Sequence, residues 1–247
     1  MKRLYHLHIP RTSGLGICHS LWKTFNNNGL PSDVFSPDVS TLMYDHKAMI
    51  GYPFISGHFA KNPITESEDD LNVFSLVREP VEHYLSIAAY VSKSAGQKMS
   101  NEYMDEFLYG NITPFGVNEL FSNSGNIQAK MLFCRIAFVD KSLVALSDDD
   151  VQNDNNVVFM ESDIQNEEKI KDSIGSMNLF TLKDRGKAIE WLQDTMLKSH
   201  GFGLDNTVYN VVNSSEINGF TLDISHVREI EQRSEIDSYV YRLVSEK

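Results

Sequence analysis

Residues 11–16 have the composition of an anion-binding loop. They read Arg-Thr-Ser-Gly-Leu-Gly and combine one guanidinium, two hydroxyl groups and two glycines. Arg11 offers a fork of hydrogen-bond donors that matches a phosphate or sulfate group. Gly14 and Gly16 allow the backbone to approach such a group closely. A loop of this kind favours an anion most where it leads into a helix, because the free N–H groups and the helix dipole both attract negative charge there.

The flanking residues predict that setting. Residues 4–9 form an apolar-alternating run that indicates a strand, and residues 18–25 place apolar side chains on one face of a predicted helix. The loop is not a Walker A sequence, because Ile17 and Cys18 stand where that motif has Lys and Ser or Thr. An ordinary strand-to-helix turn with a glycine bend therefore stays open as the alternative interpretation.

A second candidate for anion binding follows another predicted strand. Residues 73–77 are apolar and rich in strand formers, and residues 81–90 predict a helix. Pro80 suits the first helical turn, where no backbone N–H is needed. Arg78 therefore stands at the carboxyl end of a predicted strand, and Ser86 follows about two helical turns later. The alternatives are a helix-start ion pair for the arginine and a packing role for the serine.

Together the two stretches resemble the sulfotransferases that use 3′-phosphoadenosine 5′-phosphosulfate (PAPS), most closely the carbohydrate branch with the heparan sulfate 2-O- and 6-O-type enzymes. In that family a Pro-Lys-Thr-Gly-Gly-Thr-Ser loop binds the 5′-phosphosulfate. A later Arg-Asp-Pro segment, with a serine eight residues after the arginine, binds the 3′-phosphate. The corresponding residues here are Arg78 and Ser86, at the same spacing. The resemblance implies that residues 11–16, Arg78 and Ser86 bind PAPS and its product, 3′-phosphoadenosine 5′-phosphate.

Two further segments are similar to family motifs. Ile55-Ser56-Gly57-His58-Phe59 looks like the Gly-His segment, which implies that His58 is the general base. Residues 126–132 are similar to the Asn-x-Gln-x-Arg-x-Leu helix, which places Lys130 at the arginine position and implies contact with the cofactor or acceptor. The alternatives are a hydrogen-bonded core histidine at position 58 and a solvated helix lysine at position 130. The end of the chain, from residue 229 to 241, resembles the closing helix of the family.

The first loop departs from the family pattern at several positions. Arg11 stands for the loop lysine, Ser13 for the first glycine, and Leu15 and Gly16 for the Thr-Ser pair. Thr12, Ser13 and backbone N–H groups remain as donors beside the guanidinium. Arginine keeps the positive charge that would stabilise the leaving 5′-phosphate, so the resemblance still gives Arg11 a catalytic and a cofactor-binding role.

Length and element order indicate the fold class. A chain of 247 residues with 41% hydrophobic residues suits one domain over 1–247 with a substantial core. Further patterns predict helices over residues 127–133 and 227–244 and a strand over residues 157–160. Several predicted strands alternate with helices, which favours an α/β fold with a mainly parallel sheet. With the resemblance, we expect a P-loop-like three-layer fold whose central sheet is flanked by helices.

Charge and cysteine content exclude several classes of function. The formal net charge is −12, which disfavours nucleic acid and polyanionic polymers as partners. The two cysteines, Cys18 and Cys134, predict buried free thiols, and no cluster has the spacing of a metal site. The chain begins with Met at the first predicted strand and has no segment typical of a signal peptide or membrane span, so we expect a cytoplasmic protein.

The sequence leaves three hypotheses for function. The first is transfer of a sulfuryl group from PAPS to a hydroxyl of a carbohydrate or small metabolite, by in-line displacement with a histidine base. The second is a nucleotide-dependent phosphotransferase, which the missing Lys-Ser/Thr pair disfavours. The third is a binding protein of the same fold without turnover, for which the altered loop is the support.

Overall fold

The computed structural model describes residues 3–12, 14–30, 52–57, 71–109, 125–134, 136–138, 157–159, 161–205 and 220–247. The strands are β1 (Arg3–Leu7), β2 (Phe54–Gly57), β3 (Leu71–Val77), β4 (Ile136–Phe138), β5 (Val157–Phe159) and β6 (Asn178–Thr181). The helices are α1 (Gly14–Asn27), α4 (Pro80–Ser94), α5 (Asn101–Tyr109), α7 (Ile127–Phe133), the 3-10 helix η3 (Glu161–Ile164), α8 (Glu167–Gly175), α9 (Arg185–His200), α10 (Ile224–Arg233) and α11 (Glu235–Ser245).

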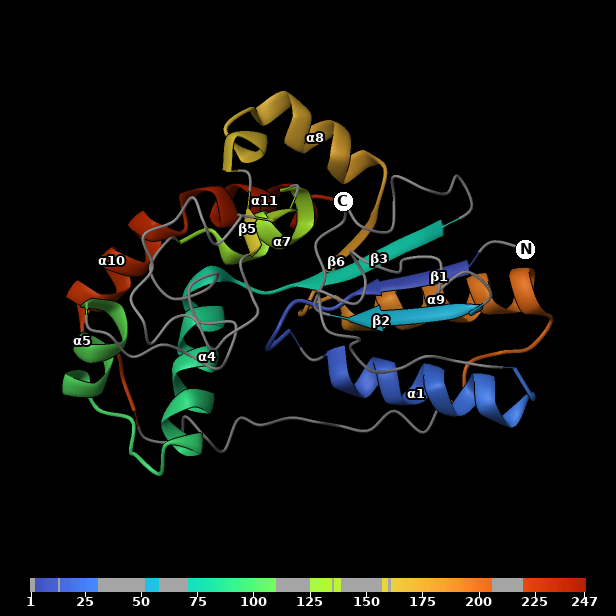
Figure 1. Ribbon diagram of the computed structural model, residues 1–247, viewed down its shortest axis with the longest axis horizontal. Helices are drawn as coiled ribbons and strands as arrows, with labels where there is room; N and C mark the ends of the chain where they lie inside the picture. Colours follow the sequence, from blue (N-terminus) through green and yellow to red (C-terminus); the bar gives the residue numbers. More distant parts are fainter. Residues whose placement is uncertain are drawn as a thin grey trace.

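A four-stranded parallel sheet in the order β2-β1-β3-β6 forms the centre of the molecule (Figure 1). β1 pairs with β2 on one side and with β3 on the other, and β3 pairs with β6, all in parallel. A separate antiparallel pair joins β4 to β5. The expectation of an α/β fold with a mainly parallel sheet flanked by helices is confirmed.

Helices cover both faces of the sheet, as a parallel sheet requires. Successive residues of β1 point to opposite faces: Leu4 belongs to an apolar cluster with α1 and α9, whereas Tyr5 and Leu7 belong to one with α7, α8 and α11. Figure 1 shows α1 below the sheet, α9 behind its strands, and α8 and α11 above it. The two clusters form the apolar layers of a three-layer architecture.

A third apolar cluster lies beyond the carboxyl end of β3. It joins α4, α5 and α10 through Tyr84, Ala88, Met104, Phe107 and Ile230. In Figure 1, α4 continues from β3, with α5 and α10 beside it. This helical group fixes the first turns of α4 against the end of the sheet.

Local signals explain how α4 begins. Pro80 occupies the first turn, and the Glu79 carboxylate accepts a hydrogen bond from the N–H of Glu82 at 2.8 Å. The helix therefore begins two residues after Arg78, which follows directly on β3. This start holds the arginine at the junction between strand and helix.

The last part of the chain differs from the sequence prediction. The single helix predicted over residues 227–244 is wrong, because the chain forms α10 and α11 with a break at Ser234. The N–H of Asn126 bonds to the carbonyl of Arg233 at 3.0 Å, and its side-chain oxygen accepts from the N–H groups of Ile236 and Asp237 at 2.8 and 3.1 Å. These bonds occupy groups that a continuous helix would pair internally.

Candidate anion-binding site

The two predicted anion-binding arginines lie at the carboxyl ends of adjacent parallel strands. Arg11 follows β1 and Arg78 follows β3, and these strands pair in register from Arg3↔Leu71 to His6↔Phe74. In the sheet, β2 lies on one side of β1 and β3 lies on the other, so the strand order reverses direction between β1 and β3. Ligands of open α/β sheets bind at such a reversal of strand order, outside the carboxyl ends of the strands.

Arg11 makes contacts with two residues of α4. Its Nε donates to the hydroxyl oxygen of Ser86 at 3.3 Å, and its guanidinium carbon lies 4.6 Å from the centre of the Tyr90 ring. Arg78 Nη1 donates to the carbonyl of Arg11 at 3.3 Å. The structure therefore brings Arg11 together with Arg78 and Ser86, which lie 67 and 75 residues later in the sequence.

Two carboxylates, those of Glu79 and Glu82, act on the charge of Arg78. Burial lowers the pKa of Arg78, Glu82 raises it, the charge of Arg11 lowers it further, and Glu79 raises it. The Arg78 Nε lies 3.6 Å from the carboxylate of Glu82, whose side chain is 50% exposed. The ion pair that the sequence left open is thus present, but a half-exposed carboxylate is a weak counter-charge. An added phosphate or sulfate group can compete with such carboxylates, because a guanidinium holds it by two parallel hydrogen bonds.

Thr12 and the first residues of α1 shape the loop after β1. The hydroxyl of Thr12 donates to the carbonyl of Ile9 at 2.8 Å, so this buried side chain closes the turn. Helix α1 begins at Gly14, earlier than the start predicted at residue 18. Gly14, Leu15 and Gly16 therefore form its first turn, where N–H groups lack partners within the helix. Ser13 lies outside the described residues.

Arg11 has a backbone conformation that disfavours a side chain. Its φ is 64°, in the left-handed region. We expect Arg11→Gly to be more stable than Arg11→Ala by about 1 kcal/mol, because both variants lack the guanidinium and only glycine adopts this φ without strain. Urea unfolding of the two variants measures the difference. Equal midpoints would contradict backbone strain at this position.

The predicted general base lies at the boundary of the described chain. β2 ends at Gly57, so His58 would follow directly on a strand next to β1, but His58 itself lies outside the described residues. The residue before Gly57 is part of a buried cluster: Ser56 contacts the His6 ring at 2.9 Å and the Cys18 sulfur at 2.7 Å. Burial raises the pKa of Cys18 to about 12, so this thiol stays protonated and packs as a core group. Cys18 and Cys134 are both buried and free, as predicted.

Lys130 is buried in the structure and not exposed to solvent. It lies on α7 and is only 2% exposed, so the interpretation as a solvated helix lysine is wrong. Its predicted contact with cofactor or acceptor stays a prediction.

Two residues next to the arginines were not among the predicted site residues. His83, on α4, is fully buried and its Nε2 contacts the carbonyl of Pro10 at 2.8 Å. Gln128, on α7, hydrogen-bonds to the backbone of Arg78. Both residues stand within segments that resemble family motifs, residues 78–86 and 126–132, and this position was the signal that could have identified them.

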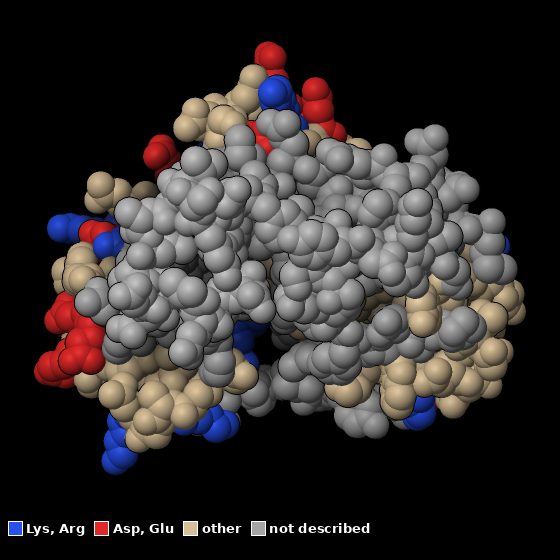
Figure 2. Space-filling model, in the orientation of Figure 1, with Lys and Arg blue, Asp and Glu red and all other residues tan. Residues whose placement is uncertain are grey.

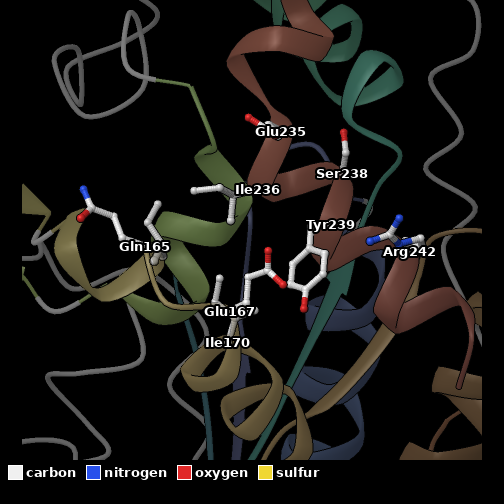
Figure 3. A pocket seen from close by; sticks show the side chains of 9 residues that line it. Gln165, Glu167, Ile170, Glu235, Ile236, Ser238, Tyr239 and Arg242 are labelled. Atoms are coloured by element: carbon white, nitrogen blue, oxygen red, sulfur yellow. The ribbon is translucent and has the colours of Figure 1, made fainter.

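A cavity of about 530 Å³ lies elsewhere, between η3, α8 and α11. Figure 3 shows Glu167 and Ile170 of α8 facing Tyr239 of α11 across it. Its lining mixes acidic, basic and apolar side chains and includes neither arginine of the anion site. The cavity is therefore separate from that site.

No protein-family model matches this sequence, and no curated protein shows significant similarity to it. Within the described segments, no helix combines the length and hydropathy that a membrane span needs. The same segments contain no group of three or more His, Cys, Asp or Glu side chains placed to hold a metal ion.

Proposed function

We propose that this chain is a PAPS-dependent sulfotransferase that transfers a sulfuryl group to a hydroxyl of a carbohydrate or small metabolite. One observation carries the proposal: Arg11, Ser86 and Arg78, which the motifs assign to the two phosphate groups of PAPS, meet at the ends of β1 and β3. Both phosphate groups belong to one nucleotide, so one ligand would contact both arginines. A guanidinium can hold each group by two parallel hydrogen bonds.

The roles of the two arginines differ in this proposal. Arg11, beside the first turn of α1, would stabilise the charge that grows on the 5′-phosphate oxygen as it leaves. Arg78 would hold the 3′-phosphate and so fix the register of the nucleotide. Ser86 contacts Arg11 in the structure, which supports a place for this serine between the two phosphate positions.

The reaction is an in-line displacement at sulfur. The acceptor oxygen forms a bond to the sulfur while the bond from sulfur to the 5′-phosphate oxygen breaks, giving a sulfate ester and 3′-phosphoadenosine 5′-phosphate. The acceptor proton passes to a base near neutral pKa, and His58 is the residue that the motif assigns to this role. The strand β2, which ends just before His58, lies next to β1 and supports this assignment.

Surface charge favours an uncharged acceptor. The exposed face of α5 presents Glu102, Asp105 and Glu106. Figure 2 shows acidic side chains gathered at this edge of the molecule. With a formal net charge of −12, a polyanionic acceptor would approach against repulsion.

Binding of 3′-phosphoadenosine 5′-phosphate, measured by calorimetry beside ATP and adenosine 5′-monophosphate, tests the proposal. We expect binding that requires the 3′-phosphate and that weakens at least about tenfold in Arg78→Ala. Arg242→Ala removes the same charge from α11 and controls for long-range electrostatics. A preference for ATP would favour the phosphotransferase hypothesis instead. Binding without sulfuryl transfer to any hydroxyl acceptor would favour a binding protein.

A further inference from the structure

The side chain of Gln128 pairs with the backbone of Arg78. Its Oε1 accepts from the N–H of Arg78 and its Nε2 donates to the carbonyl of Arg78, both at 2.8 Å. The Gln128 side chain is 1% exposed, so both bonds are shielded from water. A primary amide bonded in this way replaces the neighbouring strand that a residue within a sheet would have.

Arg78 needs such a partner because the sheet ends just before it. The register of β3 with β6 ends at Val77↔Thr181, and the carbonyl of Val77 accepts from Leu182 at 2.7 Å. Beyond that point, Gln128 is what bonds both backbone groups of Arg78 in the described structure. The amide thus fixes the backbone from which the guanidinium extends.

Gln128 is itself held by α11. The N–H groups of Gln128 and Ala129 donate to the carboxylate of Asp237 at 3.2 and 2.7 Å. In return, the side-chain oxygen of Asn126 accepts from the first turn of α11. The first turns of α7 and α11 are capped by side chains from each other's segment. The backbone of Gln128 is therefore held by α11 while its side chain bonds to the backbone of Arg78.

We propose that Gln128 is a positioning residue of the anion site, which holds the Arg78 backbone so that the guanidinium meets its anion. The inference rests on the proposed role of Arg78 in binding a phosphate group. It adds a residue on α7, 50 positions after Arg78 in the sequence, whose own side chain is too buried to contact the ligand.

A double-mutant cycle tests this inference. Gln128→Met keeps the side-chain length and removes both hydrogen bonds, and we expect it to weaken binding of 3′-phosphoadenosine 5′-phosphate about tenfold. In the Arg78→Ala background the same change is expected to have less than about a twofold effect, because the guanidinium it positions is absent. Additive losses in the two backgrounds, or no loss in the single variant, would overturn the inference.

A matched control separates positioning from general destabilisation. Gln193, on α9, accepts from the backbone N–H of Leu204 at 2.9 Å, away from the anion site. Gln193→Met is expected to lower stability and leave the affinity unchanged. If the chain binds ATP or pyrophosphate rather than the 3′-phosphorylated nucleotide, the proposed function fails, and the cycle is repeated with the anion that binds. If none of these anions binds, the inference fails too.

Discussion

Replacing Gly125 with alanine is expected to lower the free energy of unfolding by about 4 kcal/mol. Gly125 has φ 63°, and an added Cβ would lie 2.8 Å from the carbonyl carbon of Arg233 and closer still to its oxygen. That oxygen accepts the hydrogen bond from Asn126, so it cannot move without breaking the contact between α7 and the α10–α11 junction. Backbone strain and overlap with fixed backbone atoms both contribute to the loss. Urea unfolding of the variant beside the wild type measures it.

Gly96 provides a matched control for this prediction. It has nearly the same backbone angle, φ 66°, but an added Cβ there would meet nothing within 4 Å. Gly96→Ala is therefore expected to cost only about 1 kcal/mol, the strain of the left-handed conformation alone. Equal losses at positions 125 and 96 would show that the close approach to Arg233 has no energetic weight.

The elements nearest to the anion site were predictable because their signals are local. β3 is an apolar run, α4 has Pro80 in its first turn, and the bounds predicted for α7, residues 127–133, match the structure. The strand predicted over residues 157–160 is present as β5, but it pairs with β4 outside the central sheet. Sequence patterns indicate that a strand forms and do not specify its partner.

Other elements depend on contacts that no local pattern records. α8 buries only Ile170 and Ile174 and is otherwise polar, and β6 is four residues long, so neither gave a clear signal. The break between α10 and α11 arises because Asn126, more than one hundred residues earlier, bonds to both sides of Ser234. Tertiary hydrogen bonds here override a continuous helical pattern.

The candidate anion site also contains residues that were predictable from the sequence and one that was not. Arg11, Arg78 and Ser86 were identified from residue type and spacing, since each stands at a strand end or on the following helix. The support for Arg78 comes from Gln128, at a separation of 50 residues, and could not be read from spacing. The residues proposed to touch a ligand thus stand in short motifs, whereas the residue proposed to position Arg78 is found only from the folded chain.

Acidification is expected to destabilise the chain through His83. Burial lowers the pKa of His83 to about 4, against the effect of its hydrogen bond to Pro10, and the charges of Arg78 and Arg11 lower it further. The folded state therefore holds a neutral imidazole at pH values where an unfolded histidine, with a pKa of 6.5, takes up a proton. Because the unfolded state binds the extra proton, stability falls as the pH falls from 6.5 to about 4, by about 3 kcal/mol.

The variant His83→Gln isolates this contribution. Its side-chain amide can donate to the Pro10 carbonyl as Nε2 does, but it does not titrate. The stability advantage of the wild type over this variant is expected to shrink by about 3 kcal/mol between about pH 7 and pH 4 in urea unfolding. Burial raises the pKa of Asp237 to about 7, and this group titrates in both chains, so its opposite effect cancels in the difference. A difference that stays constant with pH would mean that folding leaves the protonation of His83 unchanged. The contact between the His83 ring and the carbonyl of Pro10, next to Arg11, would then not depend on a neutral imidazole.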